Sequence, residues 1–241
     1  MNTIEYGQGA VNNTIGWGQG AKVGSSFSNT KSILLDGVDD FVQTPTITLS
    51  SDFSVSIWFK KINTGTGRYK QLLGGTDIFL FGFVSYDFGV VYNGEICYWS
   101  GSQYVKLTDQ TAADGNWHHL LVTYKDSTQN LKSYFDGSLY YNDTFNAGSS
   151  PSISIIGKNT AHGRLWGGNI DEVAMFNSEL SASDVTSIYG SGVPTSLASL
   201  SPVSWYRCGD GDTAPTLTDN GSGGNNGTMT NFSTFSTDVP T

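Results

Sequence analysis

Short apolar-rich segments alternate with turn residues along this chain from about residue 32 to residue 192. Period-two alternation of apolar and polar positions is clear in residues 53–58 and again in residues 131–135. Successive side chains of a β-strand point to opposite faces of a sheet, so this pattern predicts strands. Asp136-Gly137 follows the second segment, and both residue types tolerate the positive φ of a two-residue turn, which predicts a hairpin over residues 131–139.

One segment, residues 177–189, has helical spacing instead. Ser181 can cap the helix, and Gly190 can end it. The apolar positions that would share one helix face are Val185, Ile188 and Tyr189. The pattern as a whole predicts an all-β domain with one short helix.

Length and charge narrow the possible partners. All-β sandwiches of 241 residues form single domains, and only 14% of the residues are charged, against roughly 25% in typical globular chains. The formal charge of −9 argues against binding to nucleic acid or to anionic membranes, because phosphates need clustered Lys and Arg. No apolar run approaches the roughly 20 residues that span a bilayer, so no membrane insertion is expected.

The first 29 residues form a Gly/Asn-rich segment with an internal repeat. The sequence Tyr-Gly-Gln-Gly-Ala at residues 6–10 recurs as Trp-Gly-Gln-Gly-Ala at residues 17–21. Glycine at this density disfavours a packed helix, so we expect an extended arm that docks on another surface. Its candidate contact residues are Tyr6, Gln8, Trp17 and Gln19. The alternative is a flexible leader.

Four segments, residues 34–42, 53–60, 114–124 and 167–176, carry a family resemblance. They contain Leu-Asp-Gly-Val-Asp-Asp, Phe-Ser-Val-Ser-Ile-Trp-Phe, Asp-Gly-Asn-Trp-His-His and Asn-Ile-Asp-Glu-Val-Ala in turn, and together they resemble the laminin G-like, concanavalin A-like domain. The resemblance implies a jelly-roll β-sandwich over residues 30–241. It also implies binding or assembly rather than catalysis, although fold alone does not settle function.

Residues 202–241 resemble the opening strand and loop of such domains, yet they come at the end of this chain. We expect them to form an edge strand and loop that complete the sandwich of their own chain, as in a circularly permuted domain. The alternative is that they complete a neighbouring subunit by strand addition.

The resemblance also implies a metal site. Asp36, Asp39 and Asp40 share a turn, and Asp171 belongs to a strand that the family places near it. Carboxylates from two loops would suit calcium, a hard cation that prefers oxygen ligands. The alternative is a turn with solvated carboxylates and an Asp171 bonded to backbone amides.

Other chemistry finds little support in the sequence. Asp171 and Glu172 are adjacent on a strand, so they are expected to point to opposite faces and cannot form the carboxylate pair of a glycosidase. His118 and His119 are separated in the same way, which excludes a shared metal and predicts one packed and one solvated ring. The two cysteines, Cys97 and Cys208, are expected to be buried free thiols, with one disulfide as the alternative.

Exposed aromatic residues beside polar groups can stack on sugar rings. Trp99, Tyr104 and Trp166 are the candidates for glycan binding, and the alternative for each is a place in the core or in a subunit contact.

Two functions fit these observations. The first is a non-enzymatic decoration or fibre-type protein of a phage virion, in which the arm docks on other virion proteins and the sandwich projects outward. Such a protein is expected to form a homo-oligomer, for example a trimer, and to be able to adhere to cell-surface carbohydrate. It would assemble in the host cytoplasm, which agrees with the lack of a signal-like N-terminus. The alternative is a stand-alone, lectin-like carbohydrate-binding module.

Overall fold

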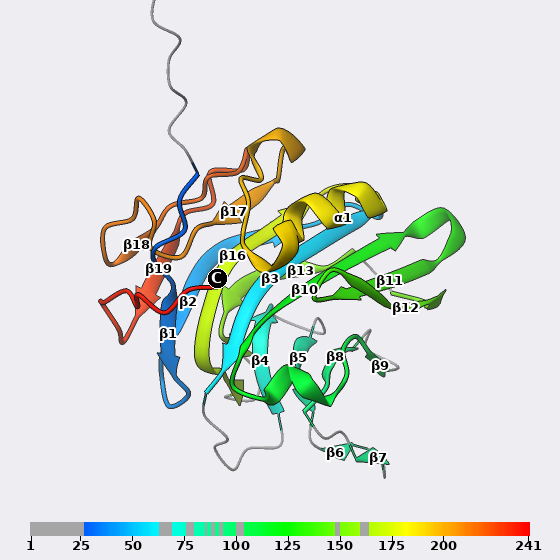
Figure 1. The fold of residues 1–241 in the computed structure, drawn as a ribbon, viewed down its shortest axis with the longest axis horizontal. Helices are drawn as coiled ribbons and strands as arrows, with labels where there is room; N and C mark the ends of the chain where they lie inside the picture. The colour runs from blue at the N-terminus through cyan, green and yellow to red at the C-terminus, as the bar shows by residue number, and fades with distance from the viewer. Residues whose placement is uncertain are drawn as a thin grey trace, which may run out of the picture.

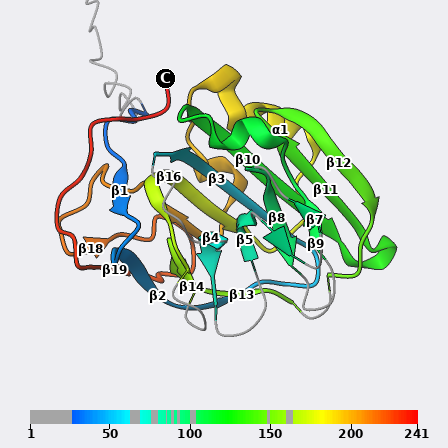
Figure 2. The same ribbon diagram turned by 90° about the horizontal axis from the view of Figure 1, so that it is seen from below.

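The computed structural model describes residues 27–62, 69–75, 80–84, 86–87, 90–91, 94–99, 104–147, 150–159 and 164–241. The arm residues Tyr6, Gln8, Trp17 and Gln19 lie outside these ranges, so the role predicted for them stays a prediction. The described residues form two antiparallel sheets packed face to face, with one short α-helix (Figures 1 and 2). This architecture confirms the predicted all-β sandwich.

The first sheet has the strand order β1-β16-β3-β10-β11-β12, and β17 also pairs with β16. The bounds of its strands are β1 Ile33–Asp36, β3 Phe53–Lys61, β10 Trp117–Lys125, β11 Asn130–Phe135, β12 Ser138–Thr144, β16 Gly167–Phe176 and β17 Ser204–Tyr206. The second sheet has the order β18-β19-β2-β13-β4-β5-β8-β9. Its strands are β2 Phe41–Thr48, β4 Tyr69–Gly74, β5 Leu80–Val84, β8 Ile96–Trp99, β9 Tyr104–Lys106, β13 Ser152–Ile156, β18 Thr216–Leu217 and β19 Gly227–Thr230. Two small hairpins pair β6 Tyr86–Asp87 with β7 Val90–Val91, and β14 Lys158–Asn159 with β15 Arg164–Leu165.

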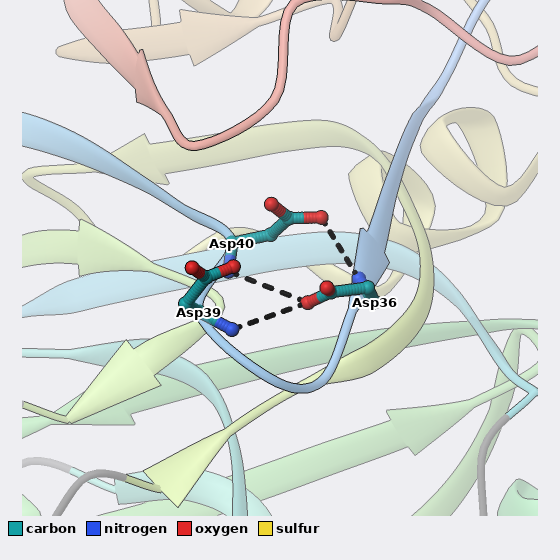
Figure 3. Close-up of side chains that lie close together, drawn as sticks. All are labelled: Asp36, Asp39 and Asp40. Atoms are coloured by element: carbon teal, nitrogen blue, oxygen red, sulfur yellow. Dashed lines mark hydrogen bonds between the residues drawn. The ribbon is translucent and has the colours of Figure 1, made fainter.

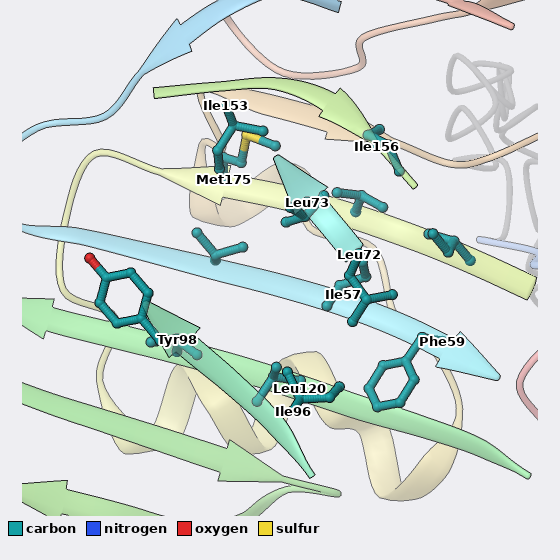
Figure 4. Close-up of a cluster of buried hydrophobic side chains, with 14 of the residues drawn as sticks. Ile57, Phe59, Leu72, Leu73, Ile96, Tyr98, Leu120, Ile153, Ile156 and Met175 are labelled. Atoms are coloured by element: carbon teal, nitrogen blue, oxygen red, sulfur yellow. The ribbon is translucent and has the colours of Figure 1, made fainter. Parts of the chain in front are cut away.

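Strand β3 shows how the alternating sequence builds this sandwich. Val55, Ile57 and Phe59 belong to the apolar cluster between the sheets. Ile57 and Phe59 are labelled in Figure 4. Trp58 points the other way, and its indole stacks on the ring of Tyr189 with 5.7 Å between centroids. The strand is therefore buried by the second sheet on one face and by the helix on the other, and each large apolar side chain so buried stabilises the fold by about 1.5–3 kcal/mol.

The predicted helix and hairpin are both present. Helix α1, Ala182–Tyr189, begins with a capping box between Ser181 and Asp184 and ends at Gly190, which has a φ of 56°. The turn between β11 and β12 consists of Asp136 and Gly137, with φ values of 47° and 73°. Single-turn 3-10 helices occupy Gln110–Ala113, Asp126–Thr128, Gly190–Gly192 and Ala198–Leu200. Among the described helices, none has the length and apolar character needed to cross a membrane.

Residues 202–241 add strands to both sheets of their own chain. β17 pairs with β16 in the first sheet, and β19 pairs with β2 in the second. Near the end of the chain, Asp238 accepts hydrogen bonds from Lys60 Nζ at 2.7 Å and from Trp117 Nε1 at 2.8 Å. The tail thus closes one side of the sandwich and crosses the outer face of the first sheet.

Candidate functional site

Asp36, Asp39 and Asp40 lie together in the turn between β1 and β2 (Figure 3), each with an oxygen atom within 4.8 Å of the other two. Asp36 Oδ1 accepts the backbone N–H groups of Val38, Asp39 and Asp40 at 2.7, 3.2 and 3.4 Å, and Asp40 Oδ2 accepts that of Asp36 at 3.0 Å. These hydrogen bonds, above all the one from Val38, hold the pKa of Asp36 below its usual value. These hydrogen bonds are sufficient to hold the turn without an ion. The three carboxylates also supply oxygen ligands of the kind that calcium prefers.

Asp171 does not join this group, which corrects the expected four-carboxylate set. β1 and β16 are antiparallel, with Ile33 opposite Ile170 and Asp36 opposite Gly167. Four residues of strand, about 13 Å, therefore separate Asp171 from the partner of Asp36. Asp171 is fully buried, and its Oδ2 accepts a hydrogen bond from Asn29 Nδ2 at 2.8 Å.

Trp166, between β15 and β16, is also placed differently from the prediction. It is 0% exposed, and its ring meets the ring of Phe59 edge-on with 5.9 Å between centroids. A side chain with no exposed surface cannot stack on a sugar. The proposed glycan contact at Trp166 is therefore wrong, and the residue belongs to the core.

Trp99 and Tyr104 lie together on the surface. They are the last residue of β8 and the first of β9, and they face each other across the two strands. Ile96, Tyr98 and Val105 on the same strands pack in the core, so Trp99 and Tyr104 point to the outer face of the second sheet. Their ring centroids are 4.4 Å apart with 37° between the planes, and both residues are partly exposed. We call Trp99 and Tyr104 the aromatic pair.

Polar groups border the aromatic pair. Lys106, two residues after Tyr104 and so on the same face, donates a hydrogen bond from Nζ to Glu95 Oε1 at 2.8 Å, and this contact raises the pKa of Lys106. Tyr140 of β12 is 43% exposed. Burial raises the pKa of Tyr140, and the charges of Asp109, Lys106 and Glu95 also act on its hydroxyl. Sequence reasoning missed Lys106, Glu95 and Tyr140 because only the folded sheets bring them together.

The two adjacent histidines point to opposite faces, but the expectation that one is solvated is wrong, because both are buried. His118 Nδ1 lies 2.8 Å from Asp136 Oδ2, and its Nε2 lies 3.0 Å from Asp114 Oδ1. Burial disfavours the charged ring, but the hydrogen bonds to Asp136 and Asp114 outweigh it and raise the pKa of His118. His119 contacts Ser56 Oγ at 2.8 Å, and burial lowers its pKa to about 3.

Asp171 and Glu172 share one face of β16, contrary to the prediction. The pairing of β16 with β3 shifts register between Asp171 and Ala174, and Glu172 has a φ of 45°. Ile170 and Val173 both pack in the core, so the two residues between them both lie on the outer side. This is a β-bulge, which period-two reasoning does not detect. Burial raises the pKa of Glu172 to about 7 and that of Asp171 well above its usual value.

The two cysteines are buried free thiols, as predicted. Burial raises the pKa of Cys97 to about 12 and that of Cys208 well above its usual value, so both are protonated and unreactive near neutral pH.

A family model described as the concanavalin A-like lectin/glucanases superfamily matches residues 36–186. No curated protein sequence matches the chain. Among solved structures, the chain is similar to a proposed carbohydrate-binding protein from Bacteroides ovatus, with a TM-score of 0.66 and 15% identity over 86% of this chain. It is also similar to the full extracellular region of the zebrafish protein Adgrg6, with a TM-score of 0.56 and 14% identity over 88% of this chain.

This chain spans 62% of the length of the Bacteroides ovatus structure and 26% of the zebrafish structure. At these identities the similarity establishes the fold. It confirms the concanavalin A-like jelly roll that the sequence resembles.

Proposed function

The chain belongs to the concanavalin A-like lectin/glucanase superfamily, and from that premise we propose that it binds carbohydrate without catalysing a reaction. The observation that carries the proposal is the aromatic pair, which combines two partly exposed rings with a polar rim on the outer face of the second sheet. The proposed carbohydrate-binding role of the similar Bacteroides ovatus protein agrees with it.

The chemistry of the aromatic pair suits a sugar. A pyranose has an apolar face of C–H groups that packs on an aromatic ring, and its edges carry hydroxyls. Lys106 and the Tyr140 hydroxyl can donate hydrogen bonds to those hydroxyls, while Glu95 can accept them. We therefore assign stacking to Trp99 and Tyr104, and orientation of the sugar to the surrounding polar groups.

A glycan array tests both parts of this proposal. The full chain and its Trp99→Ala variant are applied to the same immobilised glycans. We expect the full chain to bind a restricted set and the variant to lose it. If the full chain binds no glycan, the carbohydrate function is overturned, whereas equal binding by the variant overturns only the assignment of the aromatic pair.

A second proposal rests on the repeated sequence within residues 1–29, which carbohydrate binding does not require. In this proposal the chain is a phage virion protein whose arm, through Tyr6, Gln8, Trp17 and Gln19, docks on its particle or on other copies of the chain. Light scattering of the full chain and of a chain lacking residues 1–24 tests the self-association. A defined oligomer, a trimer for example, that becomes a monomer on deletion supports the proposal, and a monomer in both cases contradicts it.

A further inference from the structure

Residues 27–31, which we call the strap, lie just before β1 and are held by the side chains of other segments. Asn29 Nδ2 donates to Asp171 Oδ2 at 2.8 Å. Asp210 accepts three hydrogen bonds from the strap, from the N–H and the Oγ1 of Thr30 at 2.8 and 2.6 Å and from the N–H of Lys31 at 3.2 Å. The strap itself belongs to no strand. Its position therefore depends on these side-chain contacts rather than on a β-ladder.

The start of the strap covers an arginine and a tryptophan. The guanidinium of Arg207 lies 4.4 Å from the ring centroid of Phe27 and donates to the carbonyl of Ser28. Phe27 also stacks on Trp205, with 6.3 Å between ring centroids. Arg207 Nε and Trp205 Nε1 in turn donate to the carboxylate of Glu172, at 3.3 and 2.6 Å. The strap therefore closes over the groups that surround Glu172.

Three carboxylates, those of Asp171, Glu172 and Asp210, lie beside the strap, and the guanidinium of Arg207 contacts two of them. Asp171 is 0% exposed and Glu172 is 2% exposed, and the negative charge of Asp210 helps to raise the pKa of both. Arg207 contacts Glu172 at 3.3 Å and Asp210 at 3.6 Å. The titratable and charged groups of this cluster are Asp171 and Glu172 on β16, and Arg207, Cys208, Asp210 and Asp212 on the segment after β17. Lys31 on the strap contacts Asp210 through its backbone N–H. Asp171 and Glu172 are both buried, they lie beside the charge of Asp210, and among their described contacts the guanidinium of Arg207 pairs with Glu172 and not with Asp171, so this pair favours retention of a proton.

We propose that the strap is a proton-controlled latch, closed while the Asp171–Glu172 pair holds a proton and opened as rising pH removes it. This inference is independent of the proposed carbohydrate function. Opening returns both carboxyl groups to water, where they lose protons more readily. The closed state therefore binds more protons than the open state, and a rise in pH favours opening. Because no strand pairing is broken, both sheets stay intact.

Hydrogen exchange of the Thr30 and Lys31 amides in the full chain tests the latch. Exchange is measured at pH 6.0 and 8.5 and corrected for the intrinsic chemical rate. With the pKa of Glu172 at about 7 in the closed state and 4.5 in the open state, we expect the opening equilibrium to rise about tenfold. The amide of Trp205, which donates to Asp219 at 2.8 Å, lies beside the strap and serves as the control that should not change.

Variants separate the latch from general loosening. Asp171→Asn combined with Glu172→Gln imitates the protonated pair, and we expect its strap to be as protected at pH 8.5 as at pH 6.0. Asp210→Asn removes the charged acceptor, and we expect lower protection at both values. Equal protection of the wild-type strap at both values overturns the latch, as does a pH dependence that persists in the double variant. If the double variant fails to fold, shown by loss of the Trp205 control, the wild-type comparison decides alone.

Discussion

The indole of Trp99 lies 4.4 Å from the ring of Tyr104, centroid to centroid, where the end of β8 pairs with the start of β9. The antiparallel pairing itself creates this contact, because it sets the two residues opposite each other on the outer face of the sheet. The two rings lie against each other, near the ion pair of Lys106 with Glu95 on the same face of the sheet. The carbohydrate proposal depends on this arrangement.

Asp39→Asn tests calcium at the turn after β1. The described hydrogen bonds of Asp39 use its backbone N–H and carbonyl, so the substitution removes a carboxylate and keeps the turn. We expect calcium to raise the melting temperature of the wild-type chain, with a stabilisation of about 2.7 kcal/mol at one hundred times the Kd, and to have no effect on the variant. Asp36→Ala is a poor test, because losing the acceptor of three amides costs about 1 kcal/mol without any ion. Identical melting temperatures of the wild-type chain in calcium and in chelator would contradict a calcium site at this turn.

The imidazole of His118 should titrate above pH 6.5, because Asp136 and Asp114 both accept its hydrogen bonds. The contacts of protonated His118 with the two carboxylates stabilise the folded chain. This stabilisation is fully present below the pKa that His118 has in the unfolded chain, and it is lost as the pH rises through the higher pKa of the folded chain. Nuclear magnetic resonance of the ring protons measures the midpoint directly, and Asp114→Asn should lower it. His119, with a pKa of about 3, is an internal control that stays neutral. A midpoint at or below 6.5 would show that burial prevails.

Gly137→Ala should lower the free energy of unfolding by more than backbone strain alone. A left-handed φ costs a non-glycine residue about 1–2 kcal/mol, and a Cβ at residue 137 would lie 2.4 Å from Cδ1 of Tyr189. Gly211→Ala is the matched control, since Gly211 has a φ of 87° and nothing within 4 Å of the added Cβ. Denaturant unfolding compares the two variants. Equal losses would mean that the helix moves away from the turn without cost.

A chain that ends at residue 201 should aggregate. It lacks β17 and β19, which pair with β16 and β2, and it loses the core side chains of Tyr206 and Met229. Burial of each such side chain contributes about 1.5–3 kcal/mol, a large part of a total stability of about 5–15 kcal/mol. A chain that ends at Asp238 keeps the hydrogen bonds to Lys60 and Trp117 and should stay soluble. Light scattering compares them, and equal solubility and stability would refute a role of the tail in folding.

Local sequence signals predicted the elements whose formation depends on neighbouring residues. The alternation in β3, the Asp136-Gly137 turn and the Ser181 cap are of this kind, and the structure contains each of them. The contact between Trp99 and Tyr104 could also be predicted from the sequence, because the two residues are only five positions apart and lie on adjacent strands.

Positions set by tertiary structure were not predictable in this way. Trp166 follows a short strand and could equally have been exposed, and only the packing against Phe59 decides that it is buried. Asp171 lies on the expected strand, but the register of β1 with β16 takes it away from Asp36. The bulge at Glu172 inserts one extra residue into β16, so the alternation of inward and outward side chains shifts by one position there. Register and bulges depend on the partner strand, which sequence periodicity does not describe.

Calorimetric titration with the best-bound array glycan tests the central claim most directly, by comparing Trp99→Ala with Phe41→Ala. Phe41 is a partly exposed aromatic residue on β2, with the ammonium of Lys158 4.0 Å from its ring centroid. It lies on the same sheet, four strand spacings or about 19 Å from β8. Stacking on the aromatic pair predicts at least a tenfold, or about 1.4 kcal/mol, loss of affinity for Trp99→Ala and an unchanged Kd for Phe41→Ala. An unchanged Kd for a folded Trp99→Ala variant would contradict the account.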